Sequence, residues 1–170
     1  MKIQNIRSLT DRKYFFLLSS LLVLFCLRVA GQLLVALYQV PFLPPMQEWQ
    51  SGLLPYPVLV ACQFSIIALF SKICSDFYKG NGFFYEPKTF LAEPLLNCAK
   101  VYLVANAARL LIWTMMFKHH IWFTGMIPIC FHFVLASFLL VLAVHQRREL
   151  SKGALRTPLQ AISERQKVTQ

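Results

Sequence analysis

Four long apolar runs, separated by short polar connections, make up most of the chain of 170 residues. A helix needs about 20 mostly apolar residues to cross a bilayer. The pattern therefore predicts transmembrane helices at 14–38, 56–73, 94–117 and 122–144. We expect an all-α polytopic membrane protein in which residues 1–146 form a small four-helix bundle. Arg28 stands where a small residue would precede a cleavage site, so we interpret the first run as an uncleaved signal anchor.

Composition agrees with this pattern. Hydrophobic residues make up 57% of the chain, charged residues 14%, and the mean hydropathy is +0.54. These values exclude an ordinary soluble domain.

The net charge of +10 is unevenly distributed. Basic residues precede the first run, lie between the second and third, and follow the fourth, whereas the other two connections contain only Lys118. By the positive-inside rule, both termini and the middle loop are cytoplasmic, as in a plasma membrane or bacterial inner membrane. Residues 147–170 are expected to be a basic cytoplasmic tail that forms a brief helix and then loses order. Anionic lipid explains the charge, so we expect no nucleic-acid partner.

Several polar residues interrupt the apolar runs, where a membrane penalises them unless they face other helices or water. With a rise of about 1.5 Å per residue, some of them fall in one layer roughly 9–15 Å below the outer ends of the runs: Gln32, Gln63, Arg109 and His132. Arg28 and Asn106 lie a turn or less deeper. Arg28 and Gln32 are four residues apart and share one helix face. The sequence therefore predicts one polar layer shared by all four helices.

The charges in this layer lack an evident partner. No Asp or Glu occurs within the four runs, and Glu48 is the only acid on the outer side. Guanidinium groups pair with phosphate and carboxylate. We therefore predict a ligand-binding set in an outer polar pocket: Arg28, Gln32, Gln63, Asn106, Arg109, His132 and Glu48. Two alternatives remain open, namely an interhelical hydrogen-bond network without a ligand and a contact with a partner subunit.

The segment between the first two runs is rich in proline and contains Trp49. Trp49 is expected either to anchor the segment at the membrane interface or to belong to a loop that covers the polar layer, with Glu48 reaching an arginine.

These features predict a protein that binds an anionic or quinone-like lipid head, or that serves as an accessory subunit of a larger membrane complex. The alternative is a membrane enzyme acting on a lipid-linked substrate, with His132 as catalytic acid or base. A transporter is a third reading. Membrane lipid, a partner membrane subunit or a second copy are the expected partners. The sequence identifies no cofactor. The cysteines lack metal-binding spacing and His132 is the only mid-run histidine, so neither a metal site nor a bis-histidine haem is expected.

Overall fold

The computed structural model describes residues 2–38, 40, 42–49, 55–116 and 126–168. Within these residues the chain is all-helical, with five helices and no strand: α1 (Lys2–Tyr38), α2 (Met46–Trp49), α3 (Tyr56–Lys79), α4 (Thr89–Met116) and α5 (Met126–Val168). Four of them, all except α2, are long and apolar enough to cross a membrane. The prediction of four membrane-spanning helices is thus confirmed by length and composition.

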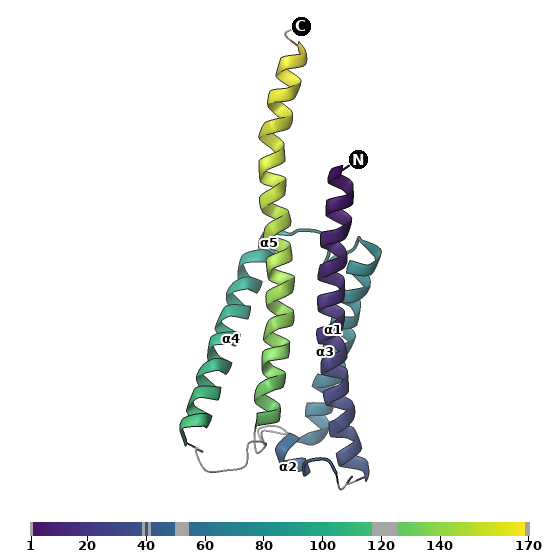
Figure 1. Ribbon diagram of the computed structural model, residues 1–170, viewed down its shortest axis with the longest axis vertical. Coiled ribbons are helices and arrows are strands. Elements are labelled where there is room, and N and C mark those ends of the chain that lie inside the picture. Colours follow the sequence, from purple (N-terminus) through teal and green to yellow (C-terminus); the bar gives the residue numbers. More distant parts are fainter. Residues whose placement is uncertain (1, 39, 41, 50–54, 117–125, 169–170) are drawn as a thin grey trace.

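The four long helices lie side by side (Figure 1). Both termini lie at one end, which we call the termini end, and α2 lies at the other, the α2 end. The connection between α3 and α4 is also at the termini end.

All four long helices extend beyond their predicted bounds at the termini end, and α1 does so by beginning at Lys2 instead of 14. α3 continues past residue 73 to Lys79, and α4 begins at Thr89 instead of 94. α3 ends where Gly80 adopts a left-handed conformation (φ 66°) and its N–H bonds the carbonyls of Asp76 and Phe77, a common helix C-cap. The predicted runs contain no acid, but the longer helices bring Asp76 into the candidate span Tyr56–Lys79 and Glu93 into Thr89–Met115.

α5 differs from its prediction at its carboxyl end. The helix continues to Val168, where we expected only a brief helix. Residues 117 and 122–125, which were assigned to the third and fourth spans, lie outside the described residues.

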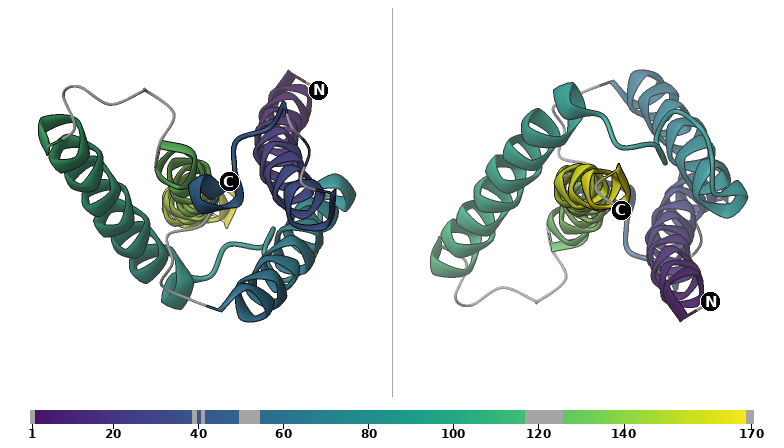
Figure 2. Two further views of the ribbon diagram at one scale, coloured as in Figure 1. Left: turned by 90° about the horizontal axis from the view of Figure 1, so that it is seen from below. Right: turned by 90° about the horizontal axis from the view of Figure 1, so that it is seen from above.

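The helices pack as an open row and not as a closed bundle. α5 contacts α1 and α4, α3 packs on α1, and among the described residues α3 and α4 make no contact. Figure 2 shows α4 on one side of α5, with α1 and α3 together on the other. The row is curved enough that Phe70 of α3 stacks on Phe138 of α5, with ring centroids 3.6 Å apart.

The buried side chains form two groups. Large residues fill the space between α1, α3 and α5: Leu18, Phe70, Ile73, Cys74, Phe77, Phe138 and Leu142. On α4 two of the four buried residues are alanines, Ala92 and Ala99, and α5 contains the buried Ala136 and Ala143. Because α4 contacts no other described helix, these alanines allow close approach of α4 and α5.

Candidate functional site

Arg28 lies inside the protein, near the α2 end of α1. Its side chain is only 8% exposed. Nη1 donates to Oε1 of Gln32, one helical turn further along, and Nη2 donates to the backbone carbonyl of Trp49 at 2.5 Å. The guanidinium therefore points away from lipid, as predicted, and its recorded acceptors are neutral oxygens.

Two glutamines continue this arrangement across to α3. Gln63 donates from Nε2 to Oε1 of Gln32 at 2.8 Å, so Gln32 Oε1 accepts from both Arg28 and Gln63. Both glutamines are buried, Gln32 completely. Within the described part of the chain, Gln32 Nε2 and Gln63 Oε1 have no hydrogen-bond partner. We call Arg28, Gln32 and Gln63 the Arg28 cluster; it has one donor and one acceptor available. Leaving a buried polar atom without a hydrogen bond costs about 1–3 kcal/mol of stability, so a ligand that pairs with these atoms would be favoured.

The short helix α2 covers the Arg28 cluster. The buried ring of Trp49 lies against Gly31, where an added Cβ would come within 2.8 Å of the indole. The indole Nε1 donates to the carbonyl of Pro44 at 2.9 Å. Trp49 is thus inside the protein, and its carbonyl contacts the arginine. The side chain of Glu48, which we predicted for that role, lies outside the described residues.

A second polar group joins α4 and α5. Tyr102 Oη and His132 Nδ1 are 2.6 Å apart. The buried Asn106 donates to the carbonyl of Tyr102 at 2.7 Å, within its own helix. We call these three residues the His132 group.

The predicted single layer is divided into these two neighbouring sets. Arg28 places its guanidinium carbon 5.8 Å from the centre of the Phe131 ring, beside His132 in sequence. No hydrogen bond among the described residues joins the two sets. Arg109 itself is exposed on α4.

Sequence analysis missed a third polar cluster, at the termini end. Asp76 is only 2% exposed. Its carboxylate accepts from Lys72 Nζ at 2.5 Å and from the Phe84 N–H at 3.3 Å. An acid in the last turn of a helix faces the negative end of the helix dipole. The position of Asp76 just before Gly80, which ends the helix, was therefore a signal in the sequence that specific partners stabilise this carboxylate.

Two adjacent residues of α5 complete this cluster. The buried Gln146 accepts from the Lys88 N–H at 2.9 Å and donates to the Phe84 carbonyl at 2.6 Å. His145 is surrounded by the rings of Tyr14, Phe77 and Tyr85, with centroids 4.6–5.5 Å away. The contacts of Asp76 and Gln146 attach the connection between α3 and α4 to its neighbours, which is a structural role.

The cysteines and acids form no metal centre among the described residues, where no group of three or more His, Cys, Asp or Glu side chains is close enough to hold an ion. All five cysteines are free thiols. Only Cys74 is buried, whereas Cys62, Cys98 and Cys130 are exposed on their helices.

Comparison with known proteins gives no guide to the function. The chain matches no protein-family model, no curated protein and no solved structure. The function must therefore be argued from the Arg28 cluster and the His132 group.

Proposed function

We propose that this integral membrane protein binds the anionic head of a lipid at the Arg28 cluster. The observation that supports the proposal is a buried guanidinium whose recorded partners, Gln32 Oε1 and the Trp49 carbonyl, are both neutral. A charge in a low-dielectric environment interacts much more strongly with an opposite charge than it does in water. An anion beside Arg28 would supply that charge.

The free polar atoms of the cluster suit such a ligand. Arg28 has five N–H donors, of which two make recorded hydrogen bonds. Gln32 Nε2 adds an unpaired donor next to them. Phosphate and carboxylate oxygens accept from a planar guanidinium in pairs. Gln63 Oε1, an unpaired acceptor, suits a hydroxyl group on the same lipid head.

By the positive-inside rule, the basic residues predict that this cluster lies in the outer half of the membrane. α2, which covers it, would then lie at the outer surface and restrict access to the site. Quinone carbonyls could use the same donors, but they would not neutralise Arg28. We therefore favour an anionic head over a quinone.

The test measures bound lipid directly. The protein is reconstituted in nanodiscs of phosphatidylglycerol and phosphatidylcholine, released gently, and its retained lipids are quantified by native mass spectrometry. Arg28→Leu should reduce retained phosphatidylglycerol about tenfold or more, since a hydrogen bond to a charged group contributes about 1.5–3 kcal/mol. Arg12→Leu is the matched control, because Arg12 is an exposed arginine on the same helix.

Arg28→Lys separates charge from shape. Lysine keeps the charge but loses the planar fork, so a large loss in this variant indicates bidentate recognition. If Arg28→Leu retains the wild-type amount of phosphatidylglycerol, the proposal is wrong. Loss of a co-purified quinone in Arg28→Leu, with phosphatidylglycerol unchanged, would favour a quinone-like head instead.

The His132 group supports a second candidate, a membrane enzyme acting on a lipid-linked substrate. Its basis is the 2.6 Å contact between Tyr102 Oη and His132 Nδ1, which orients the imidazole for acid or base chemistry. His132→Ala in the native cells should then cause a lipid substrate to accumulate. Cys130→Ala, at an exposed position of the same helix, should leave the lipid profile unchanged. An unaltered profile in His132→Ala would exclude this candidate.

A further inference from the structure

α4 carries polar residues on the side that faces away from the rest of the protein. Asn97 and Lys100 are exposed, whereas Ala92, Leu96 and Ala99 of the same helix are buried. Among the described helices α4 contacts only α5, and Figure 2 shows it at one side of the molecule. The polar pair therefore lies on an uncovered surface.

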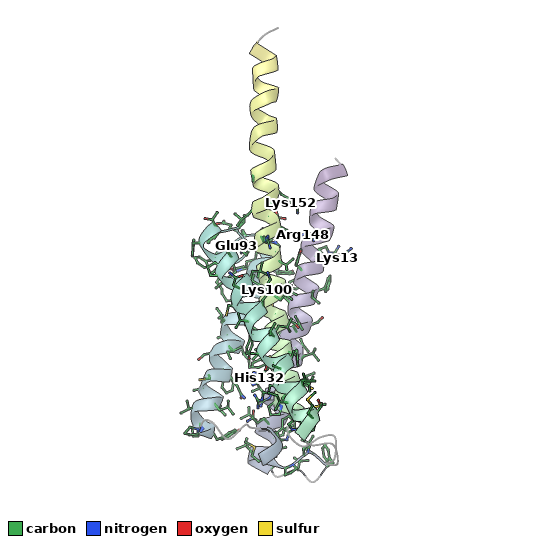
Figure 3. The ribbon with its side chains drawn as sticks, turned by 90° about the vertical axis from the view of Figure 1, so that its left-hand side faces the viewer. Lys13, Glu93, Lys100, His132, Arg148 and Lys152 are labelled. Carbon is green, nitrogen blue, oxygen red and sulfur yellow. The ribbon has the colours of Figure 1, made fainter. Side chains whose placement is uncertain are left out.

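This surface is at membrane depth. Figure 3 shows Lys100 on α4 between the levels of Glu93 and His132. Glu93 is the last charged residue before Lys100, and the offset of seven residues corresponds to about 10 Å of helix. If the membrane boundary is at Glu93, the Lys100 side chain must span most of this length of about 10 Å for its ammonium group to reach water. A lysine facing lipid here is strongly disfavoured.

Nothing in the described part of the chain compensates these groups. Neither Lys100 nor Asn97 makes a recorded hydrogen bond or ion pair, whereas Glu93 nearby is already close to Arg147 (3.6 Å). An anionic lipid head is an unsuitable partner for Lys100, because the exposed face of α4 surrounds it with apolar side chains such as Val101 and Val104 and offers no polar recess like the buried Arg28 cluster. A polar or acidic group must approach from a protein.

We infer that the outer face of α4, formed by Asn97, Lys100 and Val104, binds a transmembrane helix of a different protein that carries Asp or Glu near mid-membrane. A second copy is a poor fit. Two symmetric α4 faces would place Lys100 against Lys100, and like charges repel. Among the acids whose side chains the structure describes, none lies at this depth. They all belong to the termini end: Asp76, Glu86, Glu93 and Glu149.

The experiment is site-specific photo-cross-linking in the cells that naturally make the protein. Benzoylphenylalanine replaces Val104, which is exposed one turn from Lys100. As a matched position on another lipid-accessible helix it replaces Leu27 of α1, also exposed. Adducts are identified by sequencing the cross-linked peptide in three backgrounds, namely the wild type, Lys100→Leu and Lys100→Arg.

We expect position 104, but not position 27, to cross-link to an apolar segment of another chain that contains Asp or Glu. The adduct should fall at least tenfold in Lys100→Leu and persist in Lys100→Arg. Leucine is favourable in lipid, so loss of the adduct would not reflect failed insertion, and an unchanged melting temperature in detergent verifies this. Cross-linking between two copies, an adduct insensitive to Lys100→Leu, or lipid adducts alone would each overturn the inference.

Discussion

At the scale of single residues, the contact between Gly82 and Asp76 shows why the termini end needs particular amino acids. Gly82 has φ 120°, and a Cβ there would lie 2.6–2.8 Å from the Asp76 carboxylate. Only glycine adopts this backbone conformation without strain. The close approach keeps the connection after α3 against a carboxylate that also binds Lys72 and the Phe84 N–H.

Gly82→Ala should therefore destabilise the protein by about 2 kcal/mol or more, because it combines backbone strain with displacement of the Asp76 carboxylate. Gly80→Ala is the matched control. Gly80 also has positive φ, but a Cβ there would meet nothing within 4 Å, so only the strain of about 1 kcal/mol applies. Thermal unfolding in detergent measures both variants. Equal melting temperatures would show that the Gly82–Asp76 contact contributes nothing.

The candidate site was partly predictable at this scale. The spacing of Arg28 and Gln32 indicated a shared face, and depth alone placed Gln63 near them; both expectations agree with the hydrogen bonds. The role of the Trp49 carbonyl was not predictable, because a backbone group leaves no mark in the amino-acid pattern. Asp76 was missed because the apolar run ends before α3 does.

At the scale of elements, the association of α4 with α5 depends on small side chains. Ala99 of α4 and Ala136 of α5 are both fully buried. Water does not drive helices together inside a membrane, so close packing must do so. Sequence periodicity indicated that α4 is a helix but not which face meets α5, because nearly every position of a membrane helix is apolar or small and the amphipathic pattern is weak.

Ala99→Leu should consequently separate α4 from α5, with an overpacking cost of about 1–3 kcal/mol. Ala105→Leu places the same side chain at an exposed position of the same helix and should have no such cost. The measurement is again the melting temperature, together with alkylation of introduced cysteines along α4. If Ala105→Leu lowers the melting temperature as much as Ala99→Leu does, α4 does not pack on α5 through this face.

At the scale of the whole molecule, the structure groups the segments that sequence analysis assigned to one side of the membrane. Both termini and the connection between α3 and α4 lie at one end, and α2 lies at the other (Figure 1). Basic residues cluster in both terminal segments and in the connection between α3 and α4. Such clusters are usually retained on the cytoplasmic side of a bilayer. The geometry agrees with four crossings but does not by itself distinguish the two orientations.

The charge distribution predicts cytoplasmic termini, and a test of this orientation also bears on the Arg28 cluster. In a background without the five native cysteines, Phe42→Cys near α2, at a position 85% exposed, should react with a membrane-impermeant maleimide in intact cells. Glu86→Cys, exposed at the termini end, should react only after permeabilisation. Both sites are accessible in the folded protein, so the difference reports sidedness and not burial. The reverse pattern would place the Arg28 cluster in the cytoplasmic half of the membrane, and its lipid would then have to come from the inner leaflet.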